Sequence, residues 1–360
     1  MNTIKVIQII DSLNPGGAEV LAVNIANGLQ EVAIESHLCV TRKEGLLRGN
    51  LNDEVGFLFL NKKARFDLKA IHSLKNYIKK YEIQIIHAHS TSYFIAFCVK
   101  ILLPRIKIVW HDHYGNSDYL EVRKKQPIKL LSNYFSVIIA VNKNLVNWSK
   151  KYLKTNNVIQ LNNFAYFNVH TEKTVLKGKE GKRIVHLAAF RKQKNHLNLL
   201  KAFHKVQKNI PEATLHLIGK GNNDEYEQSI YDYIAVKKLE KNVFCYGACC
   251  DIKNILDQAT IGVLSSDSEG LPLSLLEYGL ANLAVVITNV GDCNEVVKNN
   301  KSGIIVPRNN SLELSVAINS LFESHEKRNK YSKALRLEIL NNYSKESYIS
   351  QLSQMYYTLF

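Results

Sequence analysis

Short apolar runs rich in β-branched residues recur along the first half of the chain and alternate with segments of helical period. They cover residues 4–10, 83–89, 107–111 and 136–141. Continuous apolar runs of this length are typical of strands in a parallel sheet that helices cover on both faces. The pattern predicts an α/β domain over residues 1–170.

The alternation stops at residues 171–183, a polar, lysine-rich stretch with two glycines, which we interpret as a linker between domains. It then resumes in six further apolar runs: RIVHLAAF, ATLHLIG, NVFCYG, IGVLSS, AVVIT and SGIIVP. These runs predict a second α/β domain over residues 184–343. Residues 344–360 have helical periodicity and begin with Ser344 as the expected N-cap of a terminal helix.

Composition limits the class of protein. A chain of 360 residues with 46% hydrophobic and 22% charged content can bury the cores of two domains. No apolar run approaches the roughly 20 residues of a membrane-spanning helix, and no secretory signal is present, so we expect a cytoplasmic protein. The six cysteines contain no CxxC pair, which predicts reduced thiols, mostly in the core.

The formal net charge of +15 calls for an anionic partner or serves solubility. Nucleic acid is not expected as a partner, because no reading motif for it is present. An anionic membrane surface or an anionic small molecule fits better. Two basic runs are candidates for peripheral contact with lipid headgroups: Arg123, Lys124, Lys125 and Lys129, and Lys62, Lys63, Arg65 and Lys69. For each run, solvated lysines on an ordinary helix are an equally weighted alternative.

Two loops have the composition of a phosphate site. The first apolar run leads into Pro15, Gly16 and Gly17 before a predicted helix, a position where backbone amides and a helix N-terminus bind phosphate. The alternative is an ordinary loop, because Gly-Gly is not the full GxGxxG motif.

The second loop follows the apolar run IGVL and has Pro272 near the start of a predicted helix. Helix N-termini favour anions. We expect the amides of Gly270, Leu271, Leu273 and Ser274 to face a phosphate, whereas Pro272 has no N–H.

Two carboxylates flank this second loop. Eight residues of ideal helix would separate Glu269 from Glu277 by about 12 Å, so we expect them to contact different groups of one ligand. The segment FRKQKNH supplies Arg191 and Lys194, which can neutralise a diphosphate without metal, although a solvated helix start is the alternative. No Asp-x-Asp pair occurs in the chain, which argues against a sugar transferase that holds a divalent metal by that motif. We expect no cofactor.

Two histidine pairs end apolar runs, at residues 87–89 and 111–113. Each pair lies on one face of a strand and could bind a metal ion. We favour the other interpretation, in which His111 lines the ligand-binding edge of the sheet and His87 belongs to the core. His111 could form a hydrogen bond with a sugar hydroxyl or take part in proton transfer.

Several of these motifs together resemble glycosyltransferase family 4, retaining enzymes with the GT-B fold, in which two Rossmann-like doubly wound domains face each other across a cleft. The resembling segments are PGGAE (15–19), HDHYG (111–115), FRKQKNH (190–196), EGLPLSLLE (269–277), GDCNEVV and SGIIVP. The resemblance implies a metal-independent hexosyltransferase. It would move a hexose or N-acetylhexosamine from a nucleotide sugar, above all a UDP-sugar, to a lipid-linked or saccharide acceptor in polysaccharide biosynthesis.

The resemblance also implies roles for single residues. Gly16 and Gly17 would approach the diphosphate, Arg191 and Lys194 would neutralise it, and Glu277 would bind the ribose.

Glu269 and His111 would contact the transferred sugar, with Lys194 acting in catalysis, and His113 and Asn116 would lie on the acceptor side. The terminal helix 344–360 would pack back on the first domain. Two residues depart from the family pattern: Ala189 stands where many members have an arginine, which Arg191 could replace, and Ala284 stands where proline is usual.

Two other functions remain open on the sequence. One is a GT-B-like epimerase that acts on the nucleotide sugar itself. The other is a non-catalytic module that binds nucleotide sugars. By analogy with relatives that build bacterial surface polysaccharides, a lipid-linked acceptor would place the protein at the inner face of the cytoplasmic membrane.

Overall fold

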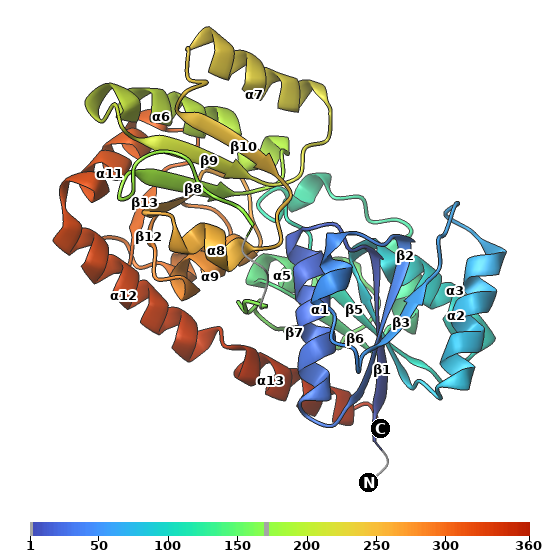
Figure 1. Ribbon diagram of the computed structural model, residues 1–360. Coiled ribbons are helices and arrows are strands. Elements are labelled where there is room, and N and C mark those ends of the chain that lie inside the picture. The colour runs from blue at the N-terminus through green and yellow to red at the C-terminus, as the bar shows by residue number, and fades with distance from the viewer. Residues whose placement is uncertain (1–2, 169–172) are drawn as a thin grey trace. The chain divides into compact units, whose positions relative to one another are not determined.

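The computed structural model describes residues 3–168 and 173–360, which form two compact units (Figure 1). The first unit is Met1–Phe164 with Lys345–Phe360, and the second is Ala165–Ser344. Residues 171 and 172 of the expected linker lie outside the described residues. Beyond them, the backbone amides of Lys173 and Thr174 donate hydrogen bonds to Asp251 Oδ2, at 2.9 and 2.7 Å, so this part of the segment is attached to the second unit.

The first unit contains a seven-stranded sheet in the order β3-β2-β1-β4-β5-β6-β7, and all its neighbouring strands are parallel. The strands are β1 (Lys5–Ser12), β2 (Glu35–Lys43), β3 (Gly56–Phe59), β4 (Ile85–His89), β5 (Lys107–Asp112), β6 (Val137–Ala140) and β7 (Val158–Gln160). Because the strand order reverses between β1 and β4, the connections after these two strands run to opposite faces of the sheet, and α/β folds commonly bind ligands at such a point.

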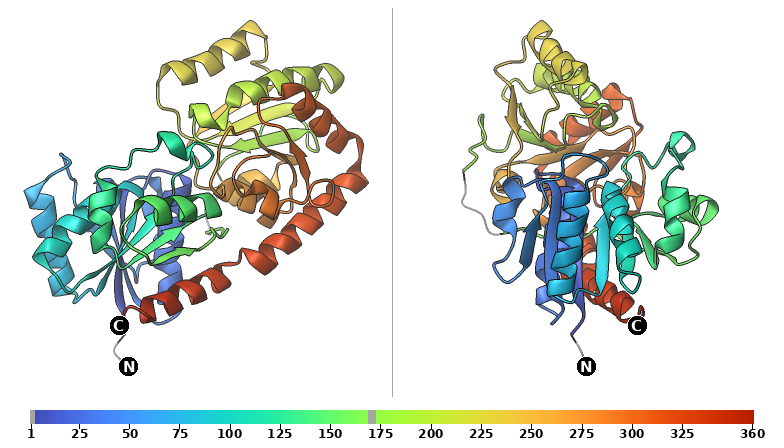
Figure 2. Two further views of the ribbon diagram at one scale, coloured as in Figure 1. Left: turned by 180° about the vertical axis from the view of Figure 1, so that it is seen from behind. Right: turned by 90° about the vertical axis from the view of Figure 1, so that its right-hand side faces the viewer.

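Helices cover both faces of this sheet (Figure 2). They are α1 (Gly17–Gln30), α2 (Leu68–Lys80), α3 (Tyr93–Leu102), α4 (Ile128–Leu131), α5 (Lys143–Tyr152) and α13 (Lys345–Tyr357). One core joins Ile7 and Ile9 of β1 to α2 and α3, and a second core joins Val6 to α1 and α13. The alternation of inward faces along β1 therefore explains why its whole apolar run is buried.

Helix α13 returns the end of the chain to the first unit. Its buried Tyr348, Ile349, Leu352 and Tyr356 belong to one core with residues of α1. At Gly28 of α1, an added Cβ would lie 2.8 Å from the Ile349 side chain, so the absence of a side chain there permits this close packing.

The second unit contains a six-stranded sheet in the order β10-β9-β8-β11-β12-β13, also parallel throughout. The strands are β8 (Arg183–Leu187), β9 (Thr214–Ile218), β10 (Val243–Gly247), β11 (Ile261–Leu264), β12 (Ala284–Thr288) and β13 (Ile304–Val306). The helices are α6 (His196–Asn209), α7 (Glu225–Val236), α8 (Ile252–Asp257), α9 (Leu273–Leu280), α10 (Cys293–Val296), α11 (Ser311–Glu323) and α12 (His325–Asn342). The strand order reverses between β8 and β11.

The predicted strands are present, and three others were not predicted. The four runs of the first half form β1, β4, β5 and β6, and the six later runs form β8 to β13. Strands β2, β3 and β7 are missing from the prediction. In β2 the apolar positions are interrupted by Ser36, His37 and Thr41, which are buried although they are polar. The prediction required continuous apolar runs and therefore missed it.

Two compositional expectations can be compared with the structure. None of the helices in the described ranges has both the length and the apolar character needed to cross a bilayer. All six cysteines are free thiols, but only Cys39 and Cys293 are buried, so the expectation that most of them lie in the core is wrong.

Candidate active site

In the second unit, Lys194 follows the carboxyl end of β8 in a short 3₁₀ turn, Lys192–Lys194. The turn ends at Asn195 in the left-handed region (φ 47°), and the Asn195 side chain caps α6 by accepting from the Asn198 amide. Ser265, just beyond β11, donates to the backbone oxygen of Lys194 at 3.0 Å. The end of β11 thus fixes the backbone that carries Lys194.

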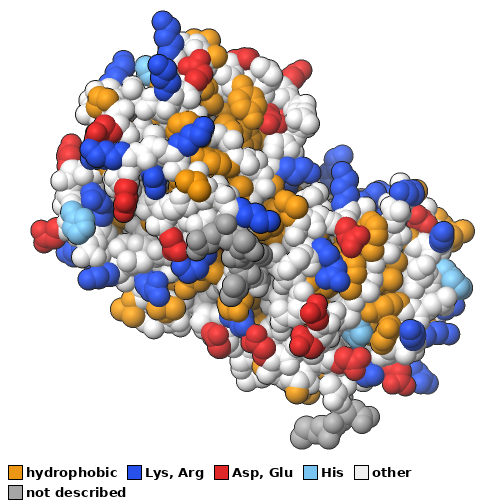
Figure 3. All heavy atoms as spheres, in the orientation of Figure 1, with side chains coloured by type: hydrophobic (Ala, Val, Ile, Leu, Met, Phe, Trp, Pro, Cys, Tyr) orange, Lys and Arg blue, Asp and Glu red, His pale blue; other side chains and the backbone are white. Residues whose placement is uncertain are grey.

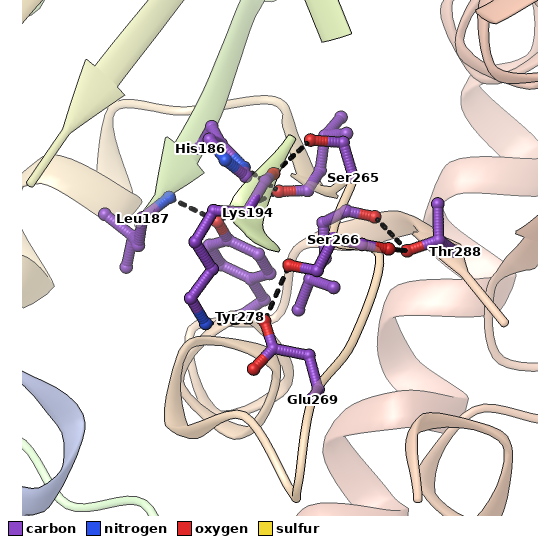
Figure 4. Close-up of polar contacts among 10 residues, drawn as sticks. His186, Leu187, Lys194, Ser265, Ser266, Glu269, Tyr278 and Thr288 are labelled. Atoms are coloured by element: carbon purple, nitrogen blue, oxygen red, sulfur yellow. Dashed lines mark hydrogen bonds and ion pairs between the residues drawn. The ribbon is translucent and has the colours of Figure 1, made fainter. Parts of the chain in front are cut away.

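The Lys194 side chain forms an ion pair with Glu269 (Figure 4). Nζ lies 2.6 Å from Glu269 Oε1, and the two side chains are 19% and 5% exposed. The Ser266 hydroxyl donates to the same oxygen at 2.6 Å, and Thr288 Oγ1 at the end of β12 donates to the Ser266 backbone oxygen at 2.6 Å. The structure therefore brings two predicted site residues together where the order of the second sheet reverses.

Sequence reasoning selected Lys194 and Glu269 but missed Ser266. Its signal was available, since a serine stands directly after an apolar strand and three residues before the glutamate.

The loop that carries Glu269 is shaped by Gly291. Gly291 adopts a left-handed conformation (φ 49°), and a Cβ there would lie 2.2 Å from the Glu269 carbonyl oxygen and 2.5 Å from that of Gly270. The Asp292 amide donates to the Gly270 oxygen at 3.0 Å. The segment GDCNEVV, to which the sequence assigned no role, thus supports the loop of Glu269.

Helix α9 begins at Leu273, with Pro272 as its extended N-cap residue. The predicted spacing of about 12 Å between Glu269 and Glu277 assumed a continuous helix. That assumption is wrong, because only residues from Leu273 onward are helical. Gly270 and Leu271 lie in the preceding loop, while Leu273 and Ser274 form the first turn, whose amides have no intrahelical acceptor.

Glu277 is on α9 in an environment unlike that of Glu269. Only 9% of the residue is exposed, and within the described ranges its side chain has no hydrogen bond or ion pair. Burial raises the pKa of Glu277 to about 7. A carboxylate in such a place is stabilised when hydroxyl groups donate to it, as the vicinal hydroxyls of a sugar can.

Arg191 stands apart from the Lys194–Glu269 pair. It is exposed, and no partner of its guanidinium is found in the described part of the chain. Its backbone amide donates to the oxygen of Ala189 at 2.7 Å, which places the two residues in one tight turn.

In the first unit, four histidines from β4, β5 and the following loop form one cluster. The rings of His87 and His89 stack at 4.6 Å, and those of His111 and His113 lie 3.9 Å apart. His111, near the carboxyl end of β5, is fully buried. Its Nε2 has no hydrogen-bond partner in the described structure. His87 is buried, as the core interpretation requires.

Nitrogen atoms of His87, His89 and His111 lie within 4.8 Å of one another, so the group has the composition of a metal site. The rings, however, are already hydrogen-bonded. His87 Nε2 lies 3.2 Å from His111 Nδ1, and His89 Nε2 lies 2.9 Å from Gln8 Oε1. Binding a metal there would require these hydrogen bonds to break.

The loop after β5 carries His113 and Asn116. Arg123 pairs with Asp112 through two hydrogen bonds of 2.6 and 2.8 Å and lies 4.1 Å from the Trp148 ring centroid. This buried pair closes the loop against β5. It also corrects the proposed lipid contact, because neither Arg123 nor the buried Lys62 is available to a membrane.

Gly16 and Gly17 begin α1 after the end of β1. Gly16 is the N-cap residue with extended backbone (φ −170°), so its conformation does not itself require glycine. Nearby on β1, Asp11 accepts hydrogen bonds from the hydroxyls of Thr41 and Thr91. Sequence reasoning missed Asp11, which only the strand order brings beside β2 and β4.

Comparison with known proteins agrees with this architecture. The model of glycosyltransferase family 4 matches residues 15–160, and that of glycosyl transferases group 1 matches residues 170–338. The chain is 25% identical over 345 residues to UDP-Gal:α-D-GlcNAc-diphosphoundecaprenol α-1,3-galactosyltransferase of Escherichia coli, covering 88% of this chain and 87% of that protein. It is 25% identical over 313 residues to the capsular polysaccharide biosynthesis glycosyltransferase CapH of Staphylococcus aureus, covering 81% and 83%.

Among solved structures, Anabaena Alr3699/HepE in complex with UDP and glucose superposes with a TM-score of 0.81 at 15% identity, over 99% of this chain and 100% of that one. This likeness shows the GT-B fold. Each family model matches less than half of the chain, and together they span most of it. With its two parallel-sheet units and its EGLPLSLLE segment (269–277), the chain belongs to glycosyltransferase family 4 and is a glycosyltransferase.

Proposed function

We propose that this glycosyltransferase is a retaining, metal-independent hexosyltransferase. It moves a hexose or N-acetylhexosamine from a nucleotide sugar to a lipid-linked or saccharide acceptor in polysaccharide biosynthesis. The nucleotide sugar that we propose is a UDP-sugar. The names of its relatives support the substrate classes, since one acts with UDP-Gal on a diphosphoundecaprenol-linked sugar and another in capsule biosynthesis. The observation that carries the proposal is the Lys194–Glu269 pair at the strand-order reversal of the second sheet.

Lys194 provides the charge that a metal supplies in other transferases. Its ammonium group has three N–H donors, of which one is used by Glu269, so the others remain for oxygens of the donor diphosphate. The first amides of α9 point in the direction that stabilises an anion, and the exposed Arg191 can add a second positive charge. Together these groups would stabilise the diphosphate as it leaves.

Glu277 would accept hydrogen bonds from the ribose hydroxyls, because its carboxylate is buried and has no protein partner in the described structure. Glu269 would bind the transferred sugar while Lys194 keeps its position fixed.

In the first unit, His111 would contact the same sugar, Gly16 and Gly17 would approach the diphosphate, and His113 and Asn116 would contact the acceptor. The departing phosphate oxygen would take the acceptor proton, which places attack and departure on one face of the sugar and retains its configuration.

The direct test is a panel of nucleotide sugars incubated with the protein, with and without a polyprenyl-diphosphate-linked saccharide. We expect release of nucleoside diphosphate that depends on the acceptor and continues in the presence of a chelator. The product should keep the anomeric configuration of the donor. Conversion of the donor without acceptor would instead indicate an epimerase. Tight binding without turnover over the whole panel would indicate a binding module.

We further propose peripheral contact with an anionic membrane through a surface of the first unit, the basic-apolar face. It consists of exposed side chains on both sides of α3: Arg65, Phe66, Leu68 and Lys69, and Lys124, Lys129, Leu130 and Tyr134. Two contacts with α3 join the halves, since Arg65 lies 5.0 Å from the Phe94 ring and Phe97 packs on Tyr134 at 5.0 Å. Figure 3 shows basic side chains beside hydrophobic ones at the edge where Figure 1 draws α2. Such a surface suits lipid headgroups and the acyl boundary beneath them.

A further inference from the structure

A chain of buried hydrogen bonds in the first unit connects Gln8 on β1 to His111 on β5 through the last helix. Gln8 Nε2 donates to the Tyr356 hydroxyl at 3.3 Å, and that hydroxyl lies 2.5 Å from His87 Nδ1. His87 Nε2 is then 3.2 Å from His111 Nδ1. All four side chains are buried.

A second branch begins at the other atom of the Gln8 amide. Gln8 Oε1 lies 2.9 Å from His89 Nε2, and His89 Nδ1 lies 2.9 Å from His113 Nε2. One amide group on the central strand therefore contacts both branches of the histidine cluster.

The rings in this cluster are neutral near pH 7. Burial lowers the pKa of His87 to about 3, that of His113 to about 3, and those of His89 and His111 well below their usual value. A neutral imidazole has one N–H donor and one acceptor nitrogen, so each hydrogen bond determines the direction of the next.

The amide of Gln8 sets that direction. Because the Tyr356 oxygen accepts from Gln8 Nε2, its single O–H is available to donate to His87 Nδ1. His87 must then carry its proton on Nε2 and donate to His111 Nδ1. The proton of His111 is left on Nε2, the buried atom that has no partner in the described structure. In the other branch, Gln8 Oε1 accepts from His89 Nε2–H, so His113 donates through Nε2 and keeps Nδ1 as an acceptor.

We propose that Gln8 and Tyr356 are positioning residues that hold His111 in its Nε2–H form, so that His111 presents a hydrogen-bond donor to an oxygen of the substrate. The tautomer follows from the hydrogen bonds among the neutral rings and does not depend on the proposed function. The identity of the substrate oxygen, a hydroxyl of the transferred sugar, rests on the proposed function. Helix α13 would then do more than pack on the first unit, because its Tyr356 connects Gln8 on β1 with His87 on β4 by hydrogen bonds.

The tautomer can be measured without any substrate. Long-range ¹⁵N–¹H spectra of histidine-labelled full-length protein distinguish the two forms, and the His111 signals are assigned by their loss in His111→Gln. We expect His111 with its proton on Nε2 and His113 with its proton on Nε2 in the wild-type protein. The opposite form of His111 would overturn the inference, because it would mean that the Gln8 amide is turned and the direction reversed.

Tyr356→Phe removes the hydroxyl that connects Gln8 with His87 and changes the shape of the side chain little. Tyr348→Phe is the matched control, because Tyr348 is on the same helix, is 3% exposed, and has a hydroxyl without a partner in the described structure. We expect the Nε2–H form of His111 to give way to a mixture in Tyr356→Phe and to persist in Tyr348→Phe. An unchanged His111 tautomer in Tyr356→Phe would contradict the proposal.

Kinetics provide a second readout. Losing one oriented neutral hydrogen bond should lower kcat about tenfold in Tyr356→Phe, with a smaller change in the donor KM, and Tyr348→Phe should retain wild-type kcat. Equal rates in both variants would contradict the positioning role even if the spectra agree. Absence of transfer in the wild-type protein would instead count against the proposed function and would leave the spectra to decide the tautomer.

Discussion

Two glutamates eight residues apart have opposite environments, and this difference separates their roles. Glu269 forms an ion pair with Lys194 and accepts a hydrogen bond from the Ser266 hydroxyl in the absence of any ligand. Glu277 is buried with neither, so its charged form is destabilised in the free protein. The first carboxylate is held in place, and the second depends on a ligand for its hydrogen bonds.

We predict that Glu277→Gln stabilises the free protein while it weakens donor binding. The pKa of Glu277 is raised on folding from 4.5 to about 7, so its contribution to stability is fully present below pH 4.5 and is lost as the pH rises toward 7. Removing the carboxylate should therefore recover about 3 kcal/mol at pH 8. Thermal unfolding at pH 8 and pH 4.5 measures this, and an equal effect at both pH values would contradict it.

Donor binding should show the same titration with the opposite consequence. If ribose hydroxyls donate to Glu277, binding lowers its pKa and releases a proton, so affinity for the nucleotide sugar should rise with pH up to about 7 and then level off. Calorimetry at pH 6 in buffers of different ionisation enthalpy counts the released protons. Proton release that persists in Glu277→Gln would show that another group is responsible.

At the level of elements, both sheets place their polar residues where the strand order reverses. β1 and β4 bring together Asp11 and Thr91, and β8 and β11 bring together Lys194 and Glu269. Carboxyl ends of parallel strands lie on one edge, so residues far apart in sequence meet there. The second site also needs the turn before α10, because Gly291 lies against the loop of Glu269.

Gly291→Ala tests this support. The new Cβ would collide with the carbonyl oxygens of Glu269 and Gly270, so we expect displacement of the loop and loss of donor affinity. Gly247→Ala is the control, since Gly247 also has positive φ (69°) but no heavy atom within 4 Å of a Cβ. It should cost about 1–2 kcal/mol of stability for backbone strain and leave donor affinity unchanged. Equal donor affinity in the two variants would remove Gly291 from the site.

At the scale of the molecule, part of the positive net charge lies on the basic-apolar face. Exposed lysines of the basic-apolar face alternate with large apolar side chains such as Leu68 and Leu130, which are 69% and 56% exposed. Exposed apolar groups among cations are expected where a protein meets anionic lipid.

Charge reversal should weaken this contact. For Lys124→Glu with Lys129→Glu we expect binding to anionic vesicles to fall more than about tenfold, at about 1 kcal/mol for each lysine removed, and to weaken with salt in the wild type. The control, Lys201→Glu with Lys205→Glu, makes the same change on exposed positions of α6 in the second unit. Co-sedimentation measures both, and equal losses would mean that net charge alone matters.

The fold was predictable because its central strands are continuous apolar runs separated by helical segments, a pattern that is typical of parallel sheets. Strand β2 was missed since it is buried with polar residues, among them His37, whose partner Tyr77 lies on α2. Such a pairing depends on tertiary contacts that no local pattern contains.

The sequence allowed us to select the candidate residues, but it did not predict how they are arranged in space. Lys194 and Glu269 stood out by composition, but their ion pair requires β8 and β11 to be neighbours, although more than 70 residues separate them. The hydrogen-bond chain from Gln8 through Tyr356 could not be predicted for the same reason, since these two residues are 348 positions apart in the sequence.

The central claim, that Lys194 stabilises the leaving diphosphate, is tested most directly by the kcat of Lys194→Ala against that of Lys192→Ala, with the donor and acceptor found by the panel. Both lysines lie in the turn Lys192–Lys194, but Lys192 is exposed and has no ion pair in the described chain. We predict that kcat falls about a hundredfold or more in Lys194→Ala, with a smaller change in donor KM, and is unchanged in Lys192→Ala. Thermal unfolding of both variants checks that they are folded. Near-wild-type kcat in folded Lys194→Ala would contradict the account.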